Sequence, residues 1–277
     1  MYSRLVGSEM CIRDRTTATV SGTVSASDAK LIAAVNNVTA TFTTGISDTL
    51  ANLLDTAGTA INANVTAAAS DHGAIAINIT DDSTSITAAK LSLITAATGG
   101  AVTFSNSQTI TGNAAQVKAA LVTDAVTASG GTTATVSGTI NAADASAIAA
   151  ANNVAATFSN GVTDSLSAFA STGSGSDELG NIVGDHDSVD ITISDDAGSM
   201  TAADLSAVTT STSGSVTLSS GQTITGNGTQ VKAALIDDAV TLGDASTATV
   251  SGTVSASDAK LIAAVTSITA TFTTGIS

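Results

Sequence analysis

The chain has 277 residues, of which 43% are hydrophobic and only 2% aromatic, and its formal net charge is −15. An acidic surface repels phosphate backbones and anionic lipids, so we expect no nucleic-acid partner. No apolar run reaches the roughly 20 residues of a membrane span, and we therefore expect no membrane insertion. The core must be built mainly from Ala, Val, Ile and Leu, which suits stacked repeating layers better than one centre of large rings.

The first fifteen residues, MYSRLVGSEMCIRDR, differ in composition from the rest of the chain. They contain the only Cys (Cys11), the only Tyr (Tyr2) and all three Arg. The segment resembles the translated sequencing-adapter peptide found in reading frames from environmental shotgun data, so 1–15 is treated as a non-native tail. Without it the net charge is −16, because the tail holds three basic and two acidic residues, and no cysteine remains for a disulfide or a thiolate metal site.

Two nested repeats organise the remaining residues, 16–277, which we expect to form one continuous domain. The sequence segment TATVSGT begins at Thr17, Thr133 and Thr247. These three copies define long repeats 17–132, 133–246 and a shortened 247–277. The last nine residues, TATFTTGIS, are identical to residues 39–47 and stop where the earlier repeat continues, which predicts truncation there. Short repeats follow one another at steps of 22 to 35 residues, each aligned on one buried strand residue. The aligned residues are Val20, Phe42, Ile77, Phe104, Val136, Phe158, Ile191, Leu218, Val250 and Phe272.

A short capped helix is expected after each strand. Ser25 with Asp28, Asn141 with Asp144, and Thr201 with Asp204 have the spacing of a capping box. The other expected caps are Ser47 or Asp48, Thr87, Asn113, Asp164 and Asn227. The Gly-rich words GSGSDELGN at 173–181 lack the Gly-Lys-Ser/Thr ending of a phosphate-binding loop and are predicted to be an insertion loop.

Strands that alternate with helices predict an α/β fold, because consecutive parallel strands need a crossover connection and that connection is almost always right-handed. We expect a right-handed solenoid of about ten strand-turn-helix repeats, with one parallel sheet and a row of short helices. Two alternatives stay open: tandem immunoglobulin-like β-sandwich domains, one per long repeat, and an all-β solenoid. The recurring Ala-rich capped segments favour the α/β solenoid.

Hydroxyl residues beside the buried ones share the outward face of the strands, because side chains alternate along a strand. Such regular Thr-x-Thr ladders resemble the flat faces of ice-binding β-solenoids. This face is therefore a candidate surface-, carbohydrate- or ice-binding site; the alternative is that Thr and Ser are simply favourable strand residues. The candidate binding residues are Thr19, Ser21, Thr41, Thr43, Thr103, Ser105, Thr135, Ser137, Thr157, Ser159, Thr217, Ser219, Thr249 and Ser251.

Acidic turns offer a second candidate site, since clustered turn carboxylates can ligate calcium. The alternative is that they cap helices and increase solubility, because Asp is an ordinary turn residue. The candidate ligands are Asp81, Asp82, Asp185, Asp187, Asp195 and Asp196. No other cofactor is expected. His72 and His186 lie 114 residues apart with no catalytic motif around them, so they are predicted to be turn residues and the chain is not expected to be an enzyme.

Four sequence segments resemble the long, acidic, Thr/Ser/Ala-rich repeat regions of very large bacterial surface and secreted proteins. These segments are GISDTLANLL, SMTAADLSAV, SVTLSSGQTITGN and TATVSGTVSASDAK. The resemblance implies an extracellular or cell-surface location and a structural role as a stalk, coat or adhesin rod, often with bound calcium. The implied partners are neighbouring repeats of a longer chain, together with a surface or glycan.

Overall fold

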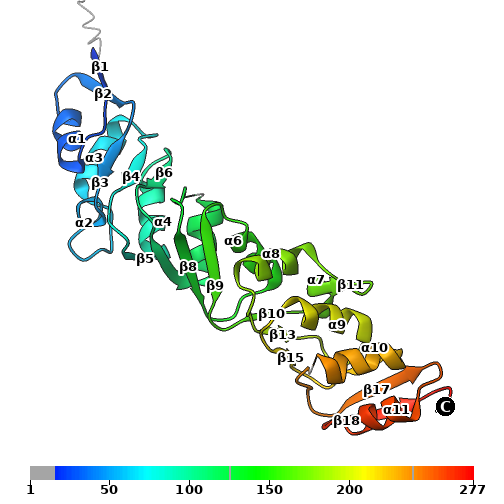
Figure 1. Cartoon of the computed structure of the whole chain (residues 1–277). Coiled ribbons are helices and arrows are strands. Elements are labelled where there is room, and N and C mark those ends of the chain that lie inside the picture. Colours follow the sequence, from blue (N-terminus) through cyan, green and yellow to red (C-terminus); the bar gives the residue numbers. More distant parts are fainter. Residues whose placement is uncertain (1–15, 125, 239) are drawn as a thin grey trace, which may run out of the picture. The chain divides into compact units, whose positions relative to one another are not determined.

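A computed structural model describes residues 16–124, 126–238 and 240–277, so the predicted tail 1–15 lies outside the described residues. The described residues form a mixed α/β structure with eleven α-helices, eighteen strands and mostly parallel sheets (Figure 1). They divide into two compact units: the residues up to Asp81 with Leu93–Ser105, and Asp82–Ser92 with Asn106–Ser277. All three boundaries between the units, after Asp81, Ser92 and Ser105, fall inside the first long repeat.

The first compact unit has two parallel sheets. One pairs β1 (Thr16–Val20) with β2 (Val38–Phe42), and the other has the order β3 (Ile46–Asp48), β4 (Ile77–Ile79), β6 (Val102–Phe104). Its helices are α1 (Ala26–Ala33), α2 (Leu50–Leu53) and α3 (Ala63–Asp71). Helix α4 (Ala88–Ala97) begins in the second compact unit and ends in the first.

The second compact unit has three parallel sheets and one antiparallel pair. The first parallel sheet has the order β5 (Ser85–Thr87), β7 (Thr109–Asn113), β8 (Thr132–Ser137), β9 (Val154–Phe158). The second has the order β10 (Val162–Asp164), β13 (Ile191–Ile193), β15 (Val216–Leu218), and the third β14 (Ser199–Thr201), β16 (Thr223–Asn227), β17 (Ser246–Ser251), β18 (Ile268–Phe272). The antiparallel pair is β11 (Ala170–Ser171) with β12 (Ser174–Gly175).

The helices of the second compact unit alternate with these strands. They are α5 (Ala114–Lys118), α6 (Ala142–Ala149), α7 (Leu166–Phe169), α8 (Asp177–Asp185), α9 (Ala202–Ser211), α10 (Gly228–Lys232) and α11 (Ala256–Ala263). Helices α5 and α10 continue into single π-helical turns, Ala119–Thr123 and Ala233–Asp237. Helices α9, α10 and α11 run beside the sheet that contains β16, β17 and β18 (Figure 1).

All ten residues on which the short repeats were aligned lie in strands, as predicted. The prediction of one continuous sheet is wrong, because most short repeats carry two strand segments rather than one. A bend separates the two segments; Gly45, with φ +80°, lies between β2 and β3. Successive repeats therefore pair through two ladders, and the ladders that end at β2 and β9 stop where the next repeat places the end of a helix beside the last strand.

The core lies between the sheets and their helices. In the sheet β5–β7–β8–β9 the residues Ile86, Ile110, Val136 and Phe158 are buried, with exposed fractions of 2% or less. Helices α5 and α6 contact the same strands and bury Val117 and other small apolar residues. Alternation along each strand therefore leaves the Thr and Ser side chains on the face away from these helices.

Most expected helix caps are confirmed. The side chains of Ser25, Asn141 and Thr201 accept a hydrogen bond from the backbone N–H three residues later, and Asn113 and Asn227 form complete capping boxes with Gln116 and Gln230.

Two predictions about helices are wrong. Helices α2 and α7 have Thr49 and Ser165 at the N-cap, and the expected caps Asp48 and Asp164 bind the backbone of an earlier helix instead. The expected insertion loop at 173–181 contains the start of α8, whose cap is Ser176 and whose buried residues include Leu179. An N-cap hydroxyl followed by two acidic residues and an apolar edge favours a helix over a loop.

Candidate functional site

Aspartate carboxylates join segments that are 22 to 31 residues apart in the sequence. In the first long repeat Oδ2 of Asp48, Asp71 and Asp81 accepts hydrogen bonds from the backbone N–H groups of Ala26 (3.0 Å), Ala40 (2.9 Å) and Leu50 (2.7 Å). In the second, Asp164, Asp185 and Asp195 accept from Ala142 (3.0 Å), Ala156 (2.8 Å) and Leu166 (2.6 Å). Each carboxylate thus binds a helix start or a strand edge of an earlier short repeat.

The two histidines make an equivalent contact. Nδ1 of His72 accepts from the backbone N–H of Phe42 at 3.2 Å, and Nδ1 of His186 from that of Phe158 at 3.3 Å. The imidazole and phenyl ring centroids are 6.4 and 6.3 Å apart. A backbone N–H only donates, so each bond requires the lone pair on Nδ1. Both histidines therefore bind the backbone of an earlier strand through Nδ1.

The pairs Asp71–His72 and Asp185–His186 together close the edges of two sheets. Each pair lies at the C-terminal end of a helix, α3 or α8. Its two side chains accept hydrogen bonds from the N–H groups of two residues, two positions apart, on the last strand of the sheet, β2 or β9. An open strand edge exposes such donors to other chains. The side chains occupy the donors that a further strand would otherwise use.

The six candidate calcium ligands are not gathered in one place. Asp81, Asp185 and Asp195 bind backbone as above, and Asp82 accepts from Nδ2 of Asn106 at 2.9 Å. No group of three or more His, Cys, Asp or Glu side chains suited to a metal lies within the described residues. Calcium binding at Asp187, Asp196 and the other four therefore stays a prediction. The backbone-accepting role was missed from the sequence, although the accepting residues recur there: Asp71–His72 and Asp81 return after 114 residues, and Asp48 returns after 116.

Two further carboxylates are held by hydrogen bonds. Oδ1 of Asp190 accepts from Oγ and from N of Ser215, at 2.7 and 2.8 Å, and these bonds lower the pKa of Asp190. Bonds from the backbone of Thr59 and Ala60 lower the pKa of the half-exposed Asp55, which closes the turn after α2. Both carboxylates are thereby favoured in their charged form.

The candidate hydroxyl face divides by the partners of its side chains. The hydroxyls of Thr43, Ser137, Ser219 and Ser251 donate to backbone carbonyl oxygens of the preceding paired strand. Thr103 and Ser105 bond to Asn78. Within the described chain, side-chain hydrogen bonds engage none of the remaining candidates, which are Thr19, Ser21, Thr41, Thr135, Thr157, Ser159, Thr217 and Thr249.

The fourteen candidate residues do not form one surface. Thr19, Ser21, Thr41, Thr43, Thr103 and Ser105 belong to the first compact unit and the other eight to the second, where they are spread over three sheets. The prediction also missed hydroxyl residues on β5 and β7. Those of β5 pair in register with those of β7, which in turn pair with Thr133 and Thr135 of β8.

Two hollows of about 350 and 570 Å³ adjoin in the second compact unit and share Thr172, Thr201 and Asp204. Some of their polar side chains are already engaged. Asp204 accepts from the backbone of Gly173 and from the hydroxyl of Thr201, while the amide of Gln222 bonds to Gly198 and Asp195. Thr172, Asp196 and Ser199 also line the first hollow, and within the described residues no hydrogen bond engages their side chains.

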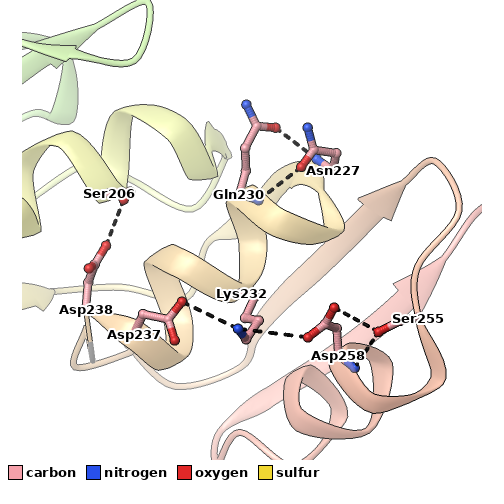
Figure 2. A network of polar contacts seen from close by, with 8 residues as sticks. All are labelled: Ser206, Asn227, Gln230, Lys232, Asp237, Asp238, Ser255 and Asp258. Carbon is pink, nitrogen blue, oxygen red and sulfur yellow. Dashed lines mark hydrogen bonds and ion pairs between the residues drawn. The ribbon is translucent and has the colours of Figure 1, made fainter.

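Polar contacts also join the last helices (Figure 2). Nζ of Lys232 lies 3.8 Å from Asp237 and 3.9 Å from Asp258, which links α10 to α11. Asp238 accepts from the hydroxyl of Ser206 in α9 at 2.7 Å. In the preceding long repeat Lys118 pairs with Asp144 between α5 and α6. These half-exposed ion pairs contribute little stability individually, but they repeat the same helix-to-helix connection.

Comparison with known proteins gives no match: no family model, no curated protein and no solved structure resembles this chain. Over the described residues, none of the helices is both long enough and apolar enough to cross a membrane.

Proposed function

We propose that this chain is a structural repeat segment of an extracellular or cell-surface protein: a stalk, a coat or an adhesin rod. In this proposal the short repeats stack as a right-handed α/β solenoid, and each added repeat lengthens the stack. Neighbouring repeats of the same chain are its principal partners.

The observation that carries the proposal is the copied set of bonds between short repeats. Three aspartates and one histidine in each full long repeat bind backbone N–H groups that lie 22 to 31 residues earlier. These polar side chains thus make hydrogen bonds between neighbouring repeats of the same chain. Such nearest-neighbour contacts are what stabilises a repeat protein, in which each repeat touches only those beside it.

The strand pairing supports the same arrangement. Ladders are parallel and in register, as between Thr111 of β7, Thr135 of β8 and Thr157 of β9. A strand, a helix and a second parallel strand in one sheet form a right-handed crossover in nearly all known cases, which is the basis for the proposed hand.

The proposed location follows from composition and resemblance. Residues 16–277 contain no cysteine and carry a net charge of −16, which suits an exported segment that must stay dispersed. The proposal assigns no reaction to the chain.

The test is to lengthen the protein by one long repeat. A second copy of 133–246 placed after Ser246 recreates a Ser–Thr junction of the kind found at 246–247. Small-angle scattering should then show a larger maximum dimension with an unchanged cross-sectional radius of gyration. A cross-section that grows with the insert, or scattering from independently moving globules, would contradict the solenoid.

A further inference from the structure

The outward face of the sheet β5–β7–β8–β9 carries two adjacent columns of hydroxyl residues. One column is Ser85, Thr109, Thr133 and Ala155, and the other is Thr87, Thr111, Thr135 and Thr157. Cα pairing places each column in strict register across the four strands. The second column is threonine throughout, whereas the first is interrupted only at Ala155.

The all-threonine column is accessible and its hydroxyl groups are uncommitted. Thr87 and Thr157 are exposed, and Thr111 and Thr135 are half-buried. Among the described residues no side-chain hydrogen bond engages these four hydroxyls. Ser137, two residues further along β8, instead donates to the carbonyl oxygen of Gly112. The sheet thus satisfies its hydroxyls at one position and leaves them open at the next.

Backbone geometry makes this array periodic in two directions. Neighbouring strands are about 4.8 Å apart, and residues two apart along a parallel strand are separated by roughly 6.6 Å. Each threonine presents a hydroxyl that both donates and accepts, as water does, beside a methyl group that orders the water around it. A linear chain molecule repeats in one direction only, whereas the surface of a crystal repeats in two.

The residue types on this face further limit the kinds of partner that it could bind. The eight positions of the two columns include no ionisable residue, although the chain has 23 acidic and eight basic residues. A neutral face complements a neutral surface. The face also offers no aromatic ring, since Phe158 of β9 points into the core with 2% of its surface exposed. Binding sites for organic ligands are usually lined with aromatic and other apolar side chains.

We propose that the hydroxyl columns of β5–β7–β8–β9 bind the ordered water of an ice surface. This activity is additional to the structural role and does not depend on it. The sheet β14–β16–β17–β18 carries an equivalent column, Thr201, Thr225, Thr249 and Thr271. There Thr201 caps α9 and Thr225 donates to the carbonyl oxygen of Met200, so the first sheet is the principal face.

The test measures inhibition of ice recrystallisation by the full chain. The informative variant is T111Y/T135Y, which places two large rings at the centre of the face while keeping good strand residues. Its matched control is T56Y, at an exposed loop position outside the sheet. A second variant, T111S/T135S, keeps both hydroxyls and removes only the methyl groups, in case the tyrosines disturb the fold. Circular dichroism and melting temperature report folding.

The unaltered protein should inhibit recrystallisation. T111Y/T135Y should need about tenfold more protein for the same effect, which corresponds to about 1.4 kcal/mol of lost binding. T111S/T135S should be weakened in the same direction, and T56Y should match the unaltered protein. The proposal is overturned if the unaltered protein has no more effect than an unrelated protein at equal concentration. It is also overturned if both folded double variants keep full activity, or if the protein sediments with insoluble cellulose or chitin but is excluded from growing ice.

Discussion

Single aspartates and histidines in this protein act as hydrogen-bond acceptors for backbone that lies far away in the sequence. A hydrogen bond to a charged group contributes about 1.5 to 3 kcal/mol, more than a neutral one. The carboxylates of Asp71 and Asp185 accept from β2 and β9 and can thus stabilise strand edges that have no further strand beside them. The acidic character of the chain is in part a consequence of this use.

At the residue scale we predict that Asp190 contributes stability that depends on pH. Its bonds from Ser215 lower its pKa in the folded state, so the contribution is present above the unfolded-state pKa, near 3.9, and is lost as pH falls through the lower folded pKa. The variant D190A has the residue found at the aligned position 76. D190A should be less stable than the unaltered protein at pH 7, and the difference should disappear at the acid end of the range.

Urea unfolding at a series of pH values measures this difference. The control is D187A, because within the described residues no side-chain bond engages the Asp187 carboxylate. A D190A defect that is the same at pH 7 and at the acid end would show that the lost interaction does not involve the charged carboxylate.

At the scale of elements, the bends between β2 and β3 and between β9 and β10 each contain a glycine at positive φ, Gly45 and Gly161. Gly161 lies between β9 and β10 with φ +69°, and a Cβ there would be 2.3 Å from the carbonyl oxygen of Asp190. Gly138, after β8, has φ +78° but nothing within 4 Å of the same position. Both positions disfavour a side chain by backbone conformation, and only Gly161 adds a clash with the next ladder.

We therefore predict that G161A destabilises the protein more than G138A does. G138A should cost about 1 to 2 kcal/mol from the left-handed conformation. G161A should cost a further 1 to 3 kcal/mol, because the clashing atom is backbone and cannot rotate away. Denaturant midpoints of the two variants provide the comparison. Equal losses would mean that the ladder can shift to admit the methyl group.

Much of the element order could be predicted from the sequence, but the second strand of most short repeats could not. Val20, Phe42 and the other aligned residues stand in clear alternating patterns, and they lie in strands. Strands such as β5 and β10 have three residues each, SIT and VTD, and directly precede a helix or its cap. Their short patterns merge with the helix starts. Pairing with a neighbouring ladder, which local sequence does not encode, makes them strands.

The residues of the candidate sites also differ in how far the sequence alone could predict their positions and partners. The outward direction of Thr135 and Thr157 follows from alternation along a strand, so the sequence could place them on one face. Their alignment with Thr87 and Thr111 depends on the register between strands 22 to 24 residues apart. Likewise, the role of Asp185 requires knowing that the N–H of Ala156 lies beside it, 29 residues earlier. Turn aspartates that ligate a metal and those that bind backbone look alike in a single sequence.

At the scale of the whole molecule, we propose that the repeats stabilise one another. Short helices such as α5, with five residues, are marginal alone in water and need the strands beside them. A small core of Ala, Val, Ile and Leu suffices because each repeat covers its neighbours. The copied aspartate and histidine bonds then hold successive repeats in register.

The most direct test of this central claim is native-state hydrogen exchange at the backbone amides bound by side chains. The amides of Ala156 and Leu166, which donate to Asp185 and Asp195, should exchange as slowly as amides in the strand ladders. In D185A, Ala156 should lose its protection while Leu166 keeps it. Exchange at Ala156 and Leu166 of the unaltered protein at the rate of an unstructured peptide would contradict the claim that these bonds join the repeats.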